Sequence, residues 1–314
     1  MRLRLPLTGK STKNGIMPLS QTHPKPDWLR IRPPGGENYS RIKLLLRQLS
    51  LHTVCEEAHC PNVAECWGGG TATVMLMGDT CTRACRFCHV KSGNPKGALD
   101  AEEPMKVAHA VNEWRLKYVV LTSVNRDDLP DGGADHFART VEAIKKLNAS
   151  IIVEVLVPDF NDDECAIGRL VSSGAEVLGH NIETIERLTP KVRDHRATYR
   201  QSLSVLRKFK ELSGGVFTKS SIMVGLGENK EELGKVMDDL RSVGVDILTI
   251  GQYLRPSSWH LPVEEYLSPE TFKELEAVGV AKGFQLVCSG PLVRSSYRAG
   301  EFFVEKMLSA RHEK

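Results

Sequence analysis

The chain alternates short apolar runs, rich in β-branched residues, with helix-like segments, and this rhythm limits its fold more than any other feature. Continuous apolar strands that alternate with helices predict an α/β protein with a parallel sheet covered by helices. Six β/α units and a later run favour a partial or complete TIM-type barrel, and an open sheet is the alternative. The runs cover residues 73–77, 118–123, 151–158, 177–182, 218–224, 247–253 and 284–288.

Polar residues follow the ends of several of these runs, at positions 122–128, 179–183, 225–228 and 251–255. In β/α barrels the loops after the strands carry the catalytic groups, so these side chains should face a common cavity. His180 lies in one of these segments, where a packed barrel histidine is a more common role than a catalytic base.

Composition and charge bear on the partners and the compartment of the protein. The chain has 42 Lys and Arg against 39 Asp and Glu, and its basic residues are spread along the sequence, which gives no case for nucleic-acid binding. We see no apolar run of about 18 residues and no secretory signal, so a cytoplasmic protein is expected. The basic residues between Arg2 and Lys25 also resemble an organelle transit segment, which makes a mitochondrial or plastid matrix the alternative.

Six of the eight cysteines lie between Cys55 and Cys88. A chain of 314 residues does not need disulfides for stability, so this crowding indicates metal ligation. The other two, Cys165 and Cys288, stand alone in apolar surroundings and are expected to be buried, inert thiols.

Cys81, Cys85 and Cys88 form a C-x3-C-x2-C motif directly after the first expected strand. Three thiolates can hold three irons of a four-iron cubane and leave the fourth iron open. An open metal position is where a substrate binds, by the same logic that separates catalytic from structural zinc sites. A zinc knuckle completed by His89 is the alternative.

A second set, Cys55, Cys60 and Cys66, has the spacing C-x4-C-x5-C and also lacks a fourth cysteine. Two under-ligated clusters in one chain would suggest that the second does more than store electrons. The alternative is a zinc site completed by His52 or His59.

The C-x3-C-x2-C motif, with Phe87 before its last cysteine, resembles that of the radical S-adenosylmethionine superfamily. Within it the chain closely resembles the lipoyl synthase family, on both cysteine sets and on the final Arg294-Ser295-Ser296-Tyr297. The likeness covers nearly the whole chain and includes residues 25–29, 122–129, 179–184 and 251–256.

The resemblance implies a partial (β/α)6 TIM-type barrel with N- and C-terminal extensions. We expect an N-terminal arm and helix over residues 1–50, an auxiliary cluster segment over 51–70, the barrel over 71–285, and a C-terminal segment over 286–314. Ser296, rather than Ser295, is the implied fourth ligand of the auxiliary cluster, and an alkoxide bond to iron should be labile. The expected contacts to S-adenosylmethionine are Ser123, Asn181, Glu183 and Arg193, the last as a partner of its carboxylate.

The implied activity is that of a sulfurtransferase, which inserts two sulfur atoms at carbons 6 and 8 of an octanoyl-lysine on a carrier protein. One [4Fe-4S] cluster would cleave S-adenosylmethionine to a radical, and the auxiliary [4Fe-4S] cluster would donate sulfur. The implied partners are octanoylated lipoyl carrier domains (E2 subunits and the glycine cleavage H protein), a reductant such as ferredoxin or flavodoxin, and iron–sulfur carrier proteins. We expect a monomer without nucleic acid or membrane partners.

Two rival functions follow from the same motifs. A tRNA methylthiotransferase would also insert sulfur, but it would carry an RNA-binding domain, and we see no segment with a basic and aromatic surface. A zinc-stabilised binding module would contain stoichiometric zinc, whereas clusters would give brown protein with iron and sulfide.

Overall fold

The computed structural model describes residues 25–30, 35, 37–57, 60, 62–68, 73–213 and 215–296. The arm before residue 25, Pro33, Pro34, His59 and Tyr297 lie outside the described residues. No helix of the described part has both the length and the apolar character needed to cross a bilayer.

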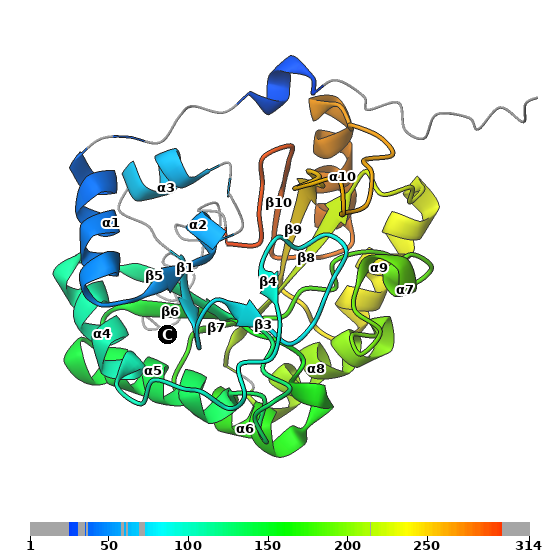
Figure 1. The fold of residues 1–314 in the computed structure, drawn as a ribbon. Coiled ribbons are helices and arrows are strands. Elements are labelled where there is room, and N and C mark those ends of the chain that lie inside the picture. Colours follow the sequence, from blue (N-terminus) through cyan, green and yellow to red (C-terminus); the bar gives the residue numbers. More distant parts are fainter. Residues whose placement is uncertain are drawn as a thin grey trace, which may run out of the picture.

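One sheet with the order β1-β2-β5-β6-β7-β8-β9-β10 dominates the described residues (Figure 1). Every neighbouring pair from β2 to β10 is parallel, whereas β1 is antiparallel to β2. Within the described ranges no pairing joins β10 to β1 or β2, so the sheet is a partial barrel. The strands are β1 (His52–Thr53), β2 (Thr73–Leu76), β5 (Tyr118–Ser123), β6 (Ile152–Leu156), β7 (Val177–Gly179), β8 (Phe217–Val224), β9 (Ile247–Gln252) and β10 (Leu286–Gly290).

Six β/α units are present, as the sequence predicts, and β10 follows them as a seventh parallel strand. The expected barrel boundary at residue 285 therefore falls just before the last strand of the sheet. The helices after the strands are α4 (Glu103–Glu113), α5 (Ala134–Leu147), α6 (Glu164–Val171), α7 (Thr189–Val192), α8 (Tyr199–Leu212), α9 (Lys230–Ser242) and α10 (Pro269–Ala281).

Local sequence signals fix where several of these helices begin. Asp163, Thr198 and Ser268 each accept a hydrogen bond from a backbone N–H in the first turn of α6, α8 and α10, respectively. Asn229 and Glu232 form a reciprocal capping box at the start of α9. Such caps satisfy amide groups that have no partner inside the helix, so each helix starts at a defined residue.

The strands are buried on both faces, which explains their continuous apolar runs. A small apolar cluster is distinct from the main core. Its side chains come from strands that are not all neighbours in the sheet. Such side chains can meet only on the concave side of a curved sheet. The members of this cluster are Tyr118, Val120, Val177, Phe217 and Ile247. Val119 and Leu121 alternate with them along β5 and belong to the main core instead. This cluster fills the barrel near the amino ends of the strands and leaves the carboxyl ends for the site.

The segment before β2 meets the end of the described chain. Helices α1 (Glu37–Gln48), α2 (Val54–Glu57) and α3 (Val63–Gly68) precede β2, and Figure 1 shows the chain after β10 running toward α2. Asn62 Nδ2 donates a hydrogen bond of 2.7 Å to the carbonyl of Leu292. The helix expected at the end of the N-terminal segment, residues 1–50, is present as α1.

Two expectations about local structure were wrong. Cys165 is exposed, because it lies in the first turn of α6 and the buried face of that helix carries Ala166, Ile167 and Leu170 instead; Cys288 is buried as expected. Strand β7 ends at Gly179 rather than at residue 182, because the Ser220 hydroxyl accepts the amide of Ile182 in place of a ladder carbonyl.

Candidate functional site

A cavity of about 640 Å³ opens at the carboxyl ends of the strands. It is lined by the loops after β2, β5, β6, β7 and β9, by the carboxyl-terminal half of β8, by the segment before β2, and by residues 293–296 from the end of the described chain. All eleven site residues expected from the sequence line it: Cys55, Cys60, Cys66, Cys81, Cys85, Cys88, Ser123, Asn181, Glu183, Arg193 and Ser296.

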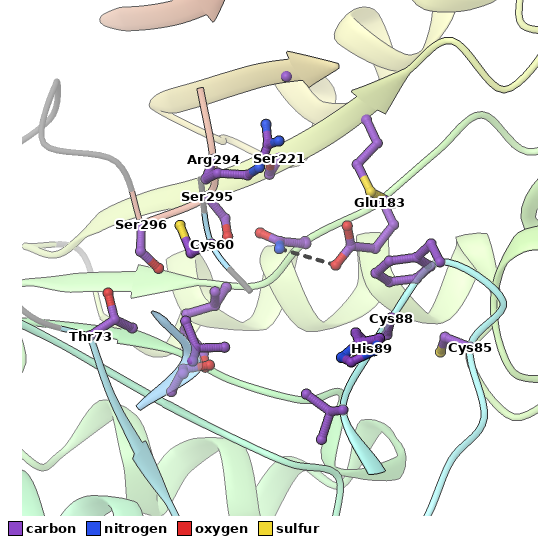
Figure 2. A pocket seen from close by; sticks show the side chains of 18 of the residues that line it. Cys60, Thr73, Cys85, Cys88, His89, Glu183, Ser221, Arg294, Ser295 and Ser296 are labelled. Carbon is purple, nitrogen blue, oxygen red and sulfur yellow. Dashed lines mark hydrogen bonds between the residues drawn. The ribbon is translucent and has the colours of Figure 1, made fainter. Parts of the chain in front are cut away.

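The two cysteine sets lie at different sides of this cavity (Figure 2). Cys60 is drawn with Ser295 and Ser296 at one side, and Cys85 and Cys88 with His89 at the other. Glu183 and Ser221 are drawn between these two sides.

The loop of the first set directs backbone amides at its sulfur atoms. The amide of Arg83 donates to Cys81 Sγ (3.4 Å), and the amide of Asp194 donates to Cys85 Sγ (3.3 Å). Burial raises the pKa of the Cys85 thiol to about 11 and that of Cys88 to about 12, although nearby backbone N–H groups oppose the rise. Buried thiols that already receive N–H donors are suited to bind as thiolates once a metal compensates their charge.

Arg83, which the sequence reasoning missed, anchors this loop from within. Its guanidinium is 3% exposed and donates to Asp127 (2.8 Å) and Asp159 (2.8 Å), two carboxylates from the loops after β5 and β6. Burial alone would raise the pKa of Asp159, but the hydrogen bonds from Arg83 hold it below its ordinary value. The ion pair thus fixes the backbone that carries Cys81 and Cys85 to the barrel. The position of Arg83 between two cysteines was the only sequence signal for it.

The second set is placed by short elements before β2. Cys55 lies in α2 and Cys66 in α3, both buried, and the amide of Cys60 donates to the carbonyl of Cys55 (3.1 Å). Burial raises the pKa of Cys55 to about 11, whereas the backbone N–H of Thr73 and the indole N–H of Trp67 lower it. This set therefore shares with the first a buried sulfur beside a backbone N–H donor.

Arg193 is the main positive group beside the first set. It is 8% exposed, and its Nη1 donates a hydrogen bond to the Ser202 hydroxyl (2.6 Å) rather than to a carboxylate. Among the ion pairs of the described residues none includes it. Burial lowers its pKa, and the nearby carboxyl of Glu183 opposes that effect. Arg193 therefore offers its charge to an anionic ligand of the cavity.

Glu183 and Asn181 form a polar pair at the end of β7. Asn181 Nδ2 donates to Glu183 Oε1 (3.1 Å), the contact drawn as a dashed line in Figure 2. Burial raises the pKa of the Glu183 carboxyl. Ser123 lines the same cavity at the end of β5 and donates to the carbonyl of Val124 (2.9 Å). His180 is a packed histidine, as expected, because both ring nitrogens have partners inside the protein.

The donor set fits iron–sulfur clusters better than a single ion. In the part of the chain that the structure describes, no three His, Cys, Asp or Glu side chains converge as the ligands of one metal ion. A structural zinc ion needs four ligands around one point, whereas each thiolate of a cluster binds a different iron. His89, the residue that would complete the alternative zinc knuckle, directs Nδ1 at the backbone carbonyl of Glu57 (3.2 Å).

Comparison with known proteins agrees with this geometry. Residues 75–240 match the family model described as the radical SAM superfamily, and residues 11–60 match the model of the N-terminal domain of lipoyl synthase. The chain is 57% identical to lipoyl synthase of Anaeromyxobacter dehalogenans, with 91% of this chain and 97% of that one covered. The chain belongs to the lipoyl synthase family.

Other lipoyl synthases of comparable similarity come from eukaryotes. The mitochondrial lipoyl synthases of Aedes aegypti and Bos taurus are 56% and 55% identical, and each comparison covers 92% of this chain. The match extends over 75% of the Aedes protein and 79% of the Bos protein.

Solved structures show the same fold at low sequence identity. Methylornithine synthase (PylB) has a TM-score of 0.51 and 15% identity, and the match covers 87% of this chain and 92% of that one. Streptococcus suis SuiB bound to S-adenosylmethionine has a TM-score of 0.55 and 12% identity, over 73% of this chain and 53% of that one. The chain is thus a lipoyl synthase family enzyme with the radical SAM fold, and a [4Fe-4S] cluster and S-adenosylmethionine belong to that superfamily.

Proposed function

We propose that this chain is a lipoyl synthase that inserts two sulfur atoms into a protein-bound octanoyl-lysine and forms lipoyl-lysine. The observation that carries the proposal is the convergence of two cysteine sets, each one ligand short of four, on a single cavity. Family membership indicates the activity, and the two cysteine sets provide ligands for the two clusters that this activity needs.

The six cysteines form two sets, and we assign one cluster to each set. Cys81, Cys85 and Cys88 would hold the cluster that leaves one iron for S-adenosylmethionine, while Cys55, Cys60 and Cys66 would hold the auxiliary cluster with Ser296 as fourth ligand. When bound, these groups supply the radical chemistry and the sulfur, which no amino-acid side chain provides. Placement of Ser296 beside Cys60 at one side of the cavity supports its role (Figure 2).

The remaining residues bind, orient and exclude water. Arg193 would pair with the carboxylate of S-adenosylmethionine, since a buried guanidinium without a carboxylate partner gains most from an anion. Ser123, Asn181 and Glu183 would provide polar contacts to the rest of that molecule. The apolar lining would accept the octanoyl chain and keep water from the reacting carbons. It comprises Met75, Leu156, Val157, Ile222 and Met223.

The proposed partners follow from this reaction. An octanoylated lipoyl carrier domain would present its lysine at the cavity mouth, and a one-electron donor such as ferredoxin or flavodoxin and an iron–sulfur carrier would serve the two clusters. We propose the cytoplasm as the compartment, with an organelle matrix as the alternative, because the relatives include bacterial and mitochondrial proteins.

The test is mass spectrometry of an octanoyl-lysyl peptide after incubation with the anaerobically reconstituted protein, reductant and S-adenosylmethionine. The expected product carries two added sulfur atoms. Cys55→Ala should still cleave S-adenosylmethionine, because the first thiol set is intact, but should insert no sulfur. As a matched control, Cys165→Ala changes an exposed thiol outside the cavity and should leave both reactions unchanged. Sulfur insertion by Cys55→Ala would contradict the proposed auxiliary role.

A further inference from the structure

Trp67 directly follows Cys66 in α3 and is packed on all sides. Its side chain has no exposed surface, and its ring lies 5.0 Å from that of Tyr39 in α1, at an interplanar angle of 32°. The indole Nε1–H nevertheless has no hydrogen-bond acceptor among the described residues. Native proteins rarely bury a donor without a partner, so we expect this N–H to gain an acceptor when a cofactor binds nearby.

The sulfur of Cys55 is the group that this N–H faces. Trp67 and Cys55 are both buried, and the indole N–H is the side-chain donor directed at that thiol. A neutral thiol is a weak acceptor, whereas a thiolate accepts strongly. The backbone N–H of Thr73 faces the same sulfur. The indole N–H of Trp67 therefore gains a strong acceptor only when the sulfur of Cys55 is a thiolate.

We propose that Trp67 is a positioning residue of the auxiliary cluster, whose indole N–H donates a hydrogen bond to the sulfur of Cys55 when that sulfur is bound to iron. The inference rests on the proposed function, because it requires a cluster on Cys55, Cys60 and Cys66. Hydrogen bonds to ligating sulfur stabilise the more negative, reduced state and raise the reduction potential. The same bond holds the sulfur in place and slows loss of the cluster.

The chain offers a matched control for this role. Trp114 at the end of α4 is also buried, and its Nε1–H also lacks an acceptor within the described residues, but it adjoins no cysteine in the sequence and is not a donor to the Cys55 thiol. Trp67→Phe and Trp114→Phe both remove one buried indole N–H and keep an aromatic ring. Only the first should alter the properties of the cluster.

The experiment uses the full chain with Cys81→Ala, Cys85→Ala and Cys88→Ala, so that the reconstituted protein holds the auxiliary cluster alone. Its midpoint potential is measured by redox titration followed by electron paramagnetic resonance. Adding Trp67→Phe should lower the potential by up to about 59 mV, the equivalent of a tenfold change in a one-electron equilibrium. Release of iron to a chelator should also become faster. Trp114→Phe should change neither quantity.

A second measurement decides the question if Trp67→Phe does not retain iron. In the parent triple variant, selectively deuterated indole N–H groups should give a deuterium coupling to the reduced cluster in electron–nuclear double resonance spectra, and the coupling should persist in Trp114→Phe. An unchanged potential in Trp67→Phe, or no indole coupling in the parent, overturns the inference. A triple variant that binds no iron at all contradicts instead the proposed auxiliary site.

Discussion

Arg193 is held at the cavity wall by two buried side chains. His180 Nδ1 lies 2.9 Å from the carbonyl of Val157, and because a carbonyl only accepts, this nitrogen carries the proton. Nε2 then accepts from the Ser202 hydroxyl (2.9 Å), whose oxygen accepts from Arg193 (2.6 Å). The neutral form of His180 therefore sets the direction of each bond in the chain.

The stability of this arrangement should depend on pH. Burial lowers the pKa of His180 from 6.5 to about 4. A depressed folded-state pKa means that the full stability is present above pH 6.5 and is lost as the pH falls from 6.5 to about 4, because the unfolded chain takes up the proton first. The loss is on the order of 3 kcal/mol, from about 1.4 kcal/mol per pKa unit.

Urea unfolding of cluster-free protein across this pH range measures the effect. The stability difference between the parent chain and His180→Asn should shrink as the pH falls. His195 is 86% exposed, and His195→Asn, the comparison at a surface histidine, should change the free energy of unfolding by less than about 0.5 kcal/mol. A His180→Asn difference that does not change with pH would show that the histidine is not held neutral.

At the scale of elements, the ion pair of Arg83 binds the cysteine loop to the barrel. Removing one partner of a buried pair is costly because it leaves charge without compensation. Asp159→Asn keeps the shape of the side chain but should destabilise the protein by about 3–5 kcal/mol. It should also lower the iron bound by the first thiol set, measured as iron per chain together with the free energy of unfolding.

An exposed ion pair provides the control for that prediction. Glu142 pairs with Arg169 between α5 and α6, and its side chain is 47% exposed. Glu142→Gln should cost less than about 1 kcal/mol, since water screens such pairs, and should leave the iron content unchanged. Equal effects of the two substitutions would contradict the anchoring role of Arg83.

Much of the element layout was predictable from the sequence, because strand periodicity and capping residues are local signals. All seven apolar runs overlap parallel strands of the sheet. The early end of β7 depends on a hydroxyl from the neighbouring strand, Ser220, and no local pattern reports such a contact. Likewise Asp127 and Asp159 are 44 and 76 residues from Arg83, so their pairing with it is set by the barrel and not by spacing.

At the scale of the whole molecule, the candidate site was likewise predictable from the sequence only in part. The cysteine motifs and the polar strand ends are readable because their chemistry needs particular residues at close spacing. The residues that support them, Arg83 and Trp67, look like ordinary charged or core positions in the sequence. Their roles follow only from burial and from the partners that the fold brings to them.

The end of the described chain closes the cavity by passing very near β9. A Cβ atom on Gly251 would lie 2.1 Å from the carbonyl oxygen of Val293, a distance that real contacts do not show. Gly251→Ala should therefore displace residues 293–296 and, with Ser296 misplaced, reduce sulfur insertion about a hundredfold, whereas cleavage of S-adenosylmethionine should persist. Hydrogen exchange of residues 291–296 and the product assay measure both effects.

Gly168 provides the comparison for that substitution. It lies in α6, and an added Cβ would meet nothing within 4 Å. Gly168→Ala should stabilise the helix by roughly 0.5–1 kcal/mol and leave sulfur insertion intact. Normal insertion by Gly251→Ala would mean that the chain after β10 does not need to approach β9 so closely.

The hydrogen bond from Asn62 to Leu292 spans 230 positions of the sequence. During synthesis the thiols of residues 55–66 leave the ribosome long before the segment that covers them has been translated. A nascent chain can complete the loop of the first thiol motif earlier than the pocket of the second, which includes residues 293–296 and cannot form before they are translated. We therefore expect iron to bind stably at the auxiliary site only after residue 292 has been translated, and a chain terminated upstream of that residue should leave those three thiols open to oxidation.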